Sequence, residues 1–153
     1  MLDQANGCAA LAGAAVYLWH CDREGRYSLY SEGATDQNYL RGVQEADDEG
    51  RVTFTTIFPA AYSGRWPHIH FEVYPSLVEA TSAGTMLVTS QLAFPEDVCD
   101  LVYATDGYEQ SVQNMAETSL EDDRVFSDGV DQQLATISDD VGSGLTATLA
   151  LAI

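Results

Sequence analysis

The chain has 153 residues, enough for a single domain that buries a hydrophobic core. Its formal net charge is −18, because 24 acidic residues stand against six arginines and no lysine. This balance argues against binding to nucleic acid or to anionic membranes, since few cations are present to neutralise phosphates. The dense carboxylates also suggest a source at high salt, where screening removes their mutual repulsion.

No targeting or membrane-spanning segment is recognisable in this sequence. Residues 1–6 lack a basic start, and no run of about 18 apolar residues occurs. A strand pattern begins almost at once, so we expect a leading segment to be missing. The compartment is left open, with the cytoplasm as the default, because the missing segment could have carried a signal. The pairing of Cys8, Cys21 and Cys99 is also open, and we favour three small buried hydrophobes.

Six stretches in the first 94 residues predict β-strands, because they are rich in apolar, β-branched and aromatic residues that partly alternate. They are residues 14–20, 26–30, 40–44, 51–58, 68–74 and 85–94. The turn at 22–25 includes Gly25, which tolerates positive φ, and this predicts a hairpin between the first two stretches. Residues 51–58 have the clearest strand pattern of the chain.

The remaining third of the chain predicts one helix and several short strands. Residues 96–103 follow a proline and carry acidic residues in their first turn, which is typical of a helix. We expect coil with a helical turn over 108–121, an edge strand at 124–126, and two late strands at 132–137 and 145–151. The pattern as a whole predicts an all-β fold, a β-sandwich of mostly antiparallel strands with one short helix and long loops. Residues 1–153 would form one domain.

The segment 60–74 contains the most informative side chains. His68 and His70 are two residues apart on a predicted strand, so both imidazoles project from the same face. Tyr62 lies on the preceding loop, from which its phenol can fold back over that face. Two histidines at this spacing fit either a metal site or the polar face of a half-exposed strand, and these residues alone leave the choice open.

Three segments resemble the hallmark segments of the intradiol ring-cleavage dioxygenases. They are WHCDREGRYSLY (19–30), RGVQEADDEGRVTFTTIFPAAYSGRWPHIHFEVY (41–74) and TSQLAFPED (89–97). The resemblance extends from Leu11 to about Leu149. It implies a catalytic domain of that family.

The resemblance also implies one Fe(III) per chain, held by Tyr27, Tyr62, His68 and His70. Tyr27 follows the turn residue Gly25 by two positions, as the family's first tyrosine ligand does, whereas Tyr30 lacks this register. Fe(III) is a hard ion that prefers anionic oxygen ligands and accepts imidazole, so these residue types suit it.

The reaction that the resemblance implies is cleavage of a catechol-type ring by O2 to a cis,cis-muconate-type diacid. Tyr62 would take a substrate proton, Arg65 would stabilise developing negative charge, and Gln91 would line the pocket. The expected partners are a small aromatic diol and O2, with a homo-oligomer left open. The sequence does not name the catechol.

Two alternatives remain at this point. The chain resembles a transthyretin-like β-sandwich binding module in its first hairpin pattern, and such a module would bind no metal. An iron-binding but inactive relative is the other, because only five residues separate Tyr62 from His68. We further expect His20 to be structural, Trp19 to lie in the core and Trp66 to form a pocket wall.

Overall fold

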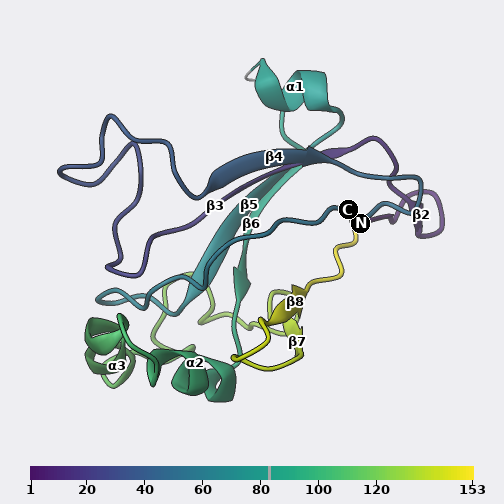
Figure 1. Cartoon of the computed structure of the whole chain (residues 1–153). Coiled ribbons are helices and arrows are strands. Elements are labelled where there is room, and N and C mark those ends of the chain that lie inside the picture. Colours follow the sequence, from purple (N-terminus) through teal and green to yellow (C-terminus); the bar gives the residue numbers. More distant parts are fainter. Residues whose placement is uncertain (83) are drawn as a thin grey trace.

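A four-stranded antiparallel sheet forms the centre of the computed structural model, which describes residues 1–82 and 84–153 (Figure 1). The sheet order is β4-β3-β5-β6. Its strands are β3 (Ala15–Trp19), β4 (Arg41–Glu45), β5 (His68–Tyr74) and β6 (Val88–Ala93). All four coincide with predicted strands, and β5 has the predicted bounds.

The register of this sheet places one row of side chains across it. Trp19 on β3 pairs with His70 on β5, and His70 pairs with Gln91 on β6. Arg41 on β4 continues the row on the other side of Trp19. Because directly opposite residues project from the same face, these four side chains share one face of the sheet.

The other face of the sheet carries the hydrophobic core. Ile69, Phe71 and Val73 alternate with the histidines and are buried, as the pattern predicts. Ile69 packs in the cluster that includes Cys99, whereas Phe71 and Val73 pack in a second cluster. Segments of irregular chain cover this second cluster, with partly buried side chains that include Val52, Phe54, Leu149, Leu151 and Ile153.

Three helices occur in the described part of the chain, where the sequence predicted one. Helix α2 (Glu96–Tyr103) has the predicted bounds and buries Cys99, Val102 and Tyr103. Helix α3 (Glu109–Met115) forms where only a helical turn was expected, and it lies beside α2 (Figure 1). Helix α1 (Leu77–Thr81) was not predicted; the Ser76 hydroxyl accepts a hydrogen bond from the Glu79 N–H and caps it.

The predicted strand at 26–30 is wrong, because this segment folds into turns held by side-chain bonds. The Tyr27 N–H donates to the Ser31 hydroxyl, the Ser28 hydroxyl donates to the Tyr39 carbonyl, and Leu29 has a φ of 70°. Such local bonds compete with a strand ladder. The strand β4 pairs with β3 in its place.

The predicted strand at 51–58 is also wrong. Its side chains alternate between exposed and half-buried over 51–54, but no strand is assigned there in the described chain. The segment is instead held by side chains of other elements. The hydroxyls of Tyr108 and Tyr103 donate to the carbonyls of Phe58 and Pro59, at 2.7 and 2.9 Å. The alternation therefore reflects packing on the core rather than pairing in a sheet.

The third wrong strand is 124–126, which forms turns in which the Val125 N–H donates to the Asp123 carboxylate and the Phe126 N–H to the Asp123 carbonyl. The two late strands do pair, but as the shorter β7 (Thr136–Ser138) and β8 (Thr146–Thr148). A further small sheet joins β1 (Leu2–Asp3) to β2 (Ala9–Ala10).

Mostly antiparallel strands with few helices are thus confirmed. In the described residues they form one four-stranded and two two-stranded sheets. No helix in this part of the chain is both long and apolar enough to cross a bilayer.

Candidate metal centre

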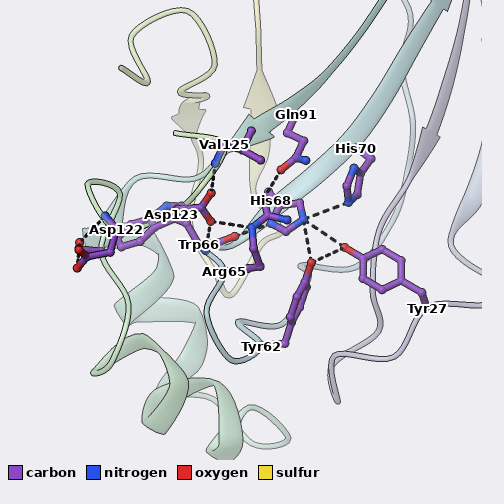
Figure 2. A network of polar contacts seen from close by, with 11 residues as sticks. Tyr27, Tyr62, Arg65, Trp66, His68, His70, Gln91, Asp122, Asp123 and Val125 are labelled. Atoms are coloured by element: carbon purple, nitrogen blue, oxygen red, sulfur yellow. Dashed lines mark hydrogen bonds and ion pairs between the residues drawn. The ribbon is translucent and has the colours of Figure 1, made fainter. Parts of the chain in front are cut away.

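Four polar atoms from three segments of the chain converge on one face of the sheet (Figure 2). The Nε2 atom of His68 lies 3.2 Å from Nε2 of His70 and 3.3 Å from each of the hydroxyl oxygens of Tyr27 and Tyr62. The two phenol oxygens are 3.5 Å apart. The structure therefore brings together the four side chains that the sequence singled out as metal ligands.

Strand β5 places the two histidines, and one carbonyl fixes the His68 ring. Nδ1 of His68 lies 2.5 Å from the carbonyl oxygen of Trp66. A carbonyl oxygen can only accept a hydrogen bond, so Nδ1 carries the proton. Nε2 therefore presents its lone pair toward Nε2 of His70 and the two phenol oxygens. This arrangement is typical of a metal-binding histidine, whose second nitrogen is held by a hydrogen bond.

Both histidines are neutral at ordinary pH. Burial lowers the pKa of His68 to about 3, and the nearby Arg65 guanidinium adds to this effect against the hydrogen bond to the Trp66 carbonyl. Burial also lowers the pKa of His70 to about 4, followed by the charges of Arg65 and Arg41. Two neutral imidazoles are therefore available as ligands without first losing a proton.

Tyr27 reaches the site from the turn that follows β3. The Asp22 carboxylate accepts hydrogen bonds from the Glu24 and Arg26 N–H groups and closes this turn. Gly25 has a φ of 80°, and a Cβ added to it would lie 3.0 Å from Cβ of Tyr62. The close approach of the two tyrosines thus depends on a glycine at this position.

Burial, followed by the neighbouring Cys21 thiol and Tyr62 phenol, raises the pKa of Tyr27 above its ordinary value. In the metal-free chain Tyr27 therefore keeps its proton. A phenol in this position becomes a phenolate only when a cation takes the place of the proton.

Tyr62 reaches the site from the loop before β5. The Ala61 N–H donates to the Ser111 hydroxyl at 3.1 Å, which ties the loop to α3. The Tyr62 carbonyl accepts from the Arg65 N–H at 3.1 Å and closes a turn. The phenol consequently folds back over the histidine face, as the sequence predicted.

Arg65 and Gln91 are the other two predicted site residues. They contact each other beside the two histidines and two tyrosines. Nη2 of Arg65 donates to Oε1 of Gln91 at 2.5 Å. Nε of Arg65 donates to the Asp123 carboxylate at 2.9 Å, and both side chains of this ion pair are buried. Burial alone would raise the pKa of Asp123, but bonds from the Trp66 and Val125 N–H groups and from Arg65 hold it below its usual value.

Sequence reasoning missed Asp123. It is one of 24 acidic residues and lies 58 positions from Arg65, with no motif around it. A buried partner for a buried arginine is expected on physical grounds, but the pattern of the sequence does not say which carboxylate provides it.

The two tryptophans have the opposite places from those expected. Trp19 is half-buried and stacks on His70, with ring centroids 4.8 Å apart and planes 7° apart. Trp66 lies in the core with Ala93 and Phe126, and its Nε1–H donates to the Phe94 carbonyl. The reason is strand alternation: Trp19 shares the face of its partner His70, whereas Trp66 lies before β5 begins.

His20 is buried and held at both nitrogens, as expected for a structural histidine. Nδ1 donates to the Cys21 carbonyl at 2.7 Å, and Nε2 contacts the Thr56 hydroxyl at 2.8 Å. Cys8, Cys21 and Cys99 are all free thiols; Cys21 and Cys99 are buried as expected, whereas Cys8 is exposed.

The donor set fits a single metal ion. Atoms bonded to one ion at about 2.1 Å lie roughly 3.0–3.6 Å apart when the bond angles are about 90–120°. The contacts between neighbouring donors fall at 3.2–3.5 Å. Among the described residues no cluster of three or more His, Cys, Asp or Glu side chains could hold a metal, so this centre depends on its phenol oxygens. Two phenols with two imidazoles suit a hard trivalent cation.

Comparison with known proteins identifies the family. The family model described as Dioxygenase matches residues 2–133. An intradiol ring-cleavage dioxygenase from Tetranychus urticae has a similar structure, with a TM-score of 0.81 and 28% identity over 96% of this chain and 74% of that one. The chain therefore belongs to the intradiol ring-cleavage dioxygenases. This membership removes the alternative of a transthyretin-like binding module.

Two bacterial relatives match a shorter segment. A chlorocatechol 1,2-dioxygenase of Rhodococcus opacus is 35% identical over 52 residues, which is 34% of this chain and 20% of that protein. A catechol 1,2-dioxygenase of a Pseudomonas strain is 36% identical over 52 residues, 34% of this chain and 17% of that protein. The match thus spans a fifth or less of each of these relatives.

Proposed function

We propose that this chain is an Fe(III)-dependent dioxygenase that uses O2 to cleave a catechol-type ring between its two hydroxyl-bearing carbons. The product would be a cis,cis-muconate-type diacid, and residues 1–153 would act as one catalytic domain. The observation that carries the proposal is the convergence of two phenol oxygens and two imidazole nitrogens at 3.2–3.5 Å. Membership of the family supports the same reaction.

The residues that would hold one ferric ion per chain are Tyr27, Tyr62, His68 and His70. Two phenolates would offset two of its three positive charges, which favours Fe(III) over Fe(II). When bound, the ion would supply the Lewis acidity that activates a chelated catechol toward O2. The protein would keep the two histidines neutral and the His68 ring fixed throughout.

Tyr62 would act as the base for the substrate. Of the two protons that a catechol loses when it binds as a dianion, one would go to the phenolate oxygen of Tyr62, which would then move aside, and the other to a hydroxide from solvent. Tyr27, His68 and His70 would remain in place.

Arg65 would stabilise the negative charge that develops on the ring and on the attacking oxygen. Asp123 and Gln91 hold its guanidinium from two sides. A donor fixed in this way needs no rearrangement as the charge appears. Gln91 would line the pocket next to it.

The test is to reconstitute the purified protein with ferric iron and to measure its visible spectrum and its oxygen uptake on a panel of catechols. We expect a red-brown protein with tyrosinate-to-iron charge transfer, and ring-cleavage products that absorb in the ultraviolet. A His68→Ala protein is the control and should stay colourless. A wild-type protein that binds no ferric iron would contradict the proposal.

The second candidate is an iron-binding relative without activity. It is favoured by the short connection between Tyr62 and His68, which leaves only five residues to shape the pocket. A coloured protein that consumes no oxygen with any catechol would support this candidate over the first.

A further inference from the structure

One buried carboxylate, that of Asp123, connects several parts of the site. Its side chain is 0% exposed and accepts three hydrogen bonds. Oδ2 accepts from Nε of Arg65 at 2.9 Å and from the Trp66 N–H at 2.7 Å, and Oδ1 accepts from the Val125 N–H at 2.8 Å. Figure 2 shows Asp123 pointing toward the site, with the adjacent Asp122 directed away from it.

The partners of Asp123 lead directly to the donor atoms. The peptide group that follows Arg65 gives its N–H to Asp123, and the carbonyl of Trp66 accepts from Nδ1 of His68. The guanidinium that Asp123 holds at Nε gives its Nη2–H to Gln91. Hydrogen bonds thus connect this carboxylate to Arg65 and Gln91 and, through the backbone of Trp66, to His68.

We propose that Asp123 is a positioning residue of the dioxygenase reaction. It fixes the Arg65 guanidinium beside the donor atoms and, through the backbone of Trp66, orients the His68 ring. This role rests on the proposed function, but the geometry that it requires exists in the metal-free chain and can be measured there.

A carboxylate is needed at this position because every neighbour is a donor. An asparagine carries one oxygen and one NH2 group. Whichever way its amide is turned, the NH2 group faces either the Val125 N–H or the donors of Arg65 and Trp66. The Arg65 cation would also lose its buried counter-charge.

The kinetic test compares Asp123→Asn with Asp122→Asn in the iron-loaded protein. Asp122 is the matched control, because it is the neighbouring aspartate, is exposed, and accepts from the Ser119 hydroxyl instead. We expect Asp123→Asn to lower kcat about 10- to 100-fold with a smaller change in KM, as for other residues that orient a site from behind. Asp122→Asn should behave as the wild type. A kcat unchanged in Asp123→Asn overturns the proposal.

A second measurement uses metal-free protein and needs no activity. The Arg65 Nε–H proton, assigned by its loss in Arg65→Lys, should exchange with solvent at least tenfold faster in Asp123→Asn than in wild type or Asp122→Asn. The 15N shifts of His68 should change from one fixed tautomer to a mixture. If both signals are unchanged, the positioning role is excluded whether or not the chain is a dioxygenase.

Wild-type protein provides the decisive comparison if Asp123→Asn does not fold. In the wild type, the Arg65 Nε–H should exchange far more slowly than that of Arg26, whose side chain is 53% exposed in its ion pair with Asp22. Equal exchange rates would mean that Asp123 does not hold Arg65, and would overturn the proposal.

Discussion

Tyr27 and Tyr62 present the same atom to the same imidazole nitrogen, each at 3.3 Å, but from different segments of the chain. Tyr27 follows a closed turn, and its backbone N–H is bonded to the Ser31 hydroxyl. Tyr62 stands on a loop whose next two residues, Ser63 and Gly64, are exposed. The proposed division of labour, with Tyr27 as a fixed ligand and Tyr62 as a displaceable one, is what the resemblance to the family implies.

Replacing Tyr62 by phenylalanine should lower kcat/KM by about 10²- to 10⁴-fold, because the proposed base is removed while the ring is kept. The measurement is oxygen uptake by iron-loaded protein, with the iron content determined alongside. Tyr30→Phe is the control, since Tyr30 is 67% exposed and lies outside the donor set. Full turnover by Tyr62→Phe would eliminate the base role.

The buried histidines make the stability of the metal-free chain depend on pH. Burial lowers the pKa of His68 to about 3 in the folded state, whereas an unfolded histidine titrates near 6.5. Protons therefore favour the unfolded chain as pH falls below 6.5 toward 3, and the stabilisation is fully present only above 6.5. At pH 5 the effect of His68 alone is about 2 kcal/mol.

Urea unfolding of metal-free protein at pH 7.5 and pH 5 measures this effect. We expect His68→Asn to lose less stability than the wild type between these two values. An equal loss in both proteins would show that His68 does not titrate with a lowered pKa.

At the residue scale, strand spacing alone predicts that His68 and His70 share one face, and the loop position of Tyr62 suggests that its phenol reaches that face. The choice of Tyr27, and of all four as one set, comes from the resemblance to the family, in which a tyrosine follows the turn glycine by two positions. Asp123 has no such mark, since its role depends on a contact over 58 positions that only the fold creates. The exchanged places of Trp19 and Trp66 likewise depend on which face of the sheet each residue joins.

Among the elements, β5 and α2 could be predicted to the residue, whereas the segment 51–58 could not. Helix α2 satisfies its backbone locally, and β5, whose apolar and polar residues alternate, finds a partner strand on each side in β3 and β6. Residues 51–58 have a strand-like pattern of burial, but their position against the core is secured by tyrosine hydroxyls from α2 and from just before α3. A pattern of side chains does not say whether a neighbouring strand is available for pairing.

The turn that carries Tyr27 should be sensitive to its glycine. Gly25→Ala forces a side chain into a φ of 80° and places a Cβ 3.0 Å from Cβ of Tyr62. We expect a loss of about 1 kcal/mol in stability from the backbone term, together with weaker iron binding because the two phenols are pushed apart. Thermal unfolding and ferric titration of the visible band measure the two effects.

Gly33→Ala is the matched control for this variant. Gly33 has a φ of 75°, but no atom lies within 4 Å of an added Cβ. It should lose similar stability and keep its iron affinity. Equal iron affinity in both variants would mean that the contact between Gly25 and Tyr62 does not shape the site.

Across the whole molecule, 24 acidic residues stand against six basic ones. The net charge is −18, and in three of the four ion pairs of the described residues the arginine is exposed, so these pairs contribute little. Repulsion among carboxylates should therefore destabilise the folded chain at low salt. We expect the urea midpoint to rise from low to multimolar NaCl. A midpoint independent of salt would remove the inference of a high-salt source.

The net negative charge of the chain should also make it prefer uncharged catechols over negatively charged ones. Arg65 and Arg41 are the two arginines whose charges, after burial, lower the pKa of His70. Both already have hydrogen-bond partners. Arg65 donates to Asp123 and Gln91, and Arg41 donates to Ser28 and Tyr17. We expect kcat/KM to be higher for an uncharged catechol than for a ring-carboxylated one, with the ratio shrinking as salt rises. A preference for the carboxylated catechol at low salt would contradict this.

Because Trp19 stacks on His70, its indole fluorescence should report metal binding at the site. Its ring lies parallel to the imidazole with centroids 4.8 Å apart, while the only other tryptophan of the chain is in the core. An excited indole in van der Waals contact with a ligand of an open-shell ion loses its energy to that ion before it can emit. Ultraviolet-excited fluorescence should accordingly dim as ferric ion is added, and a Trp19→Phe protein should lose most of that response.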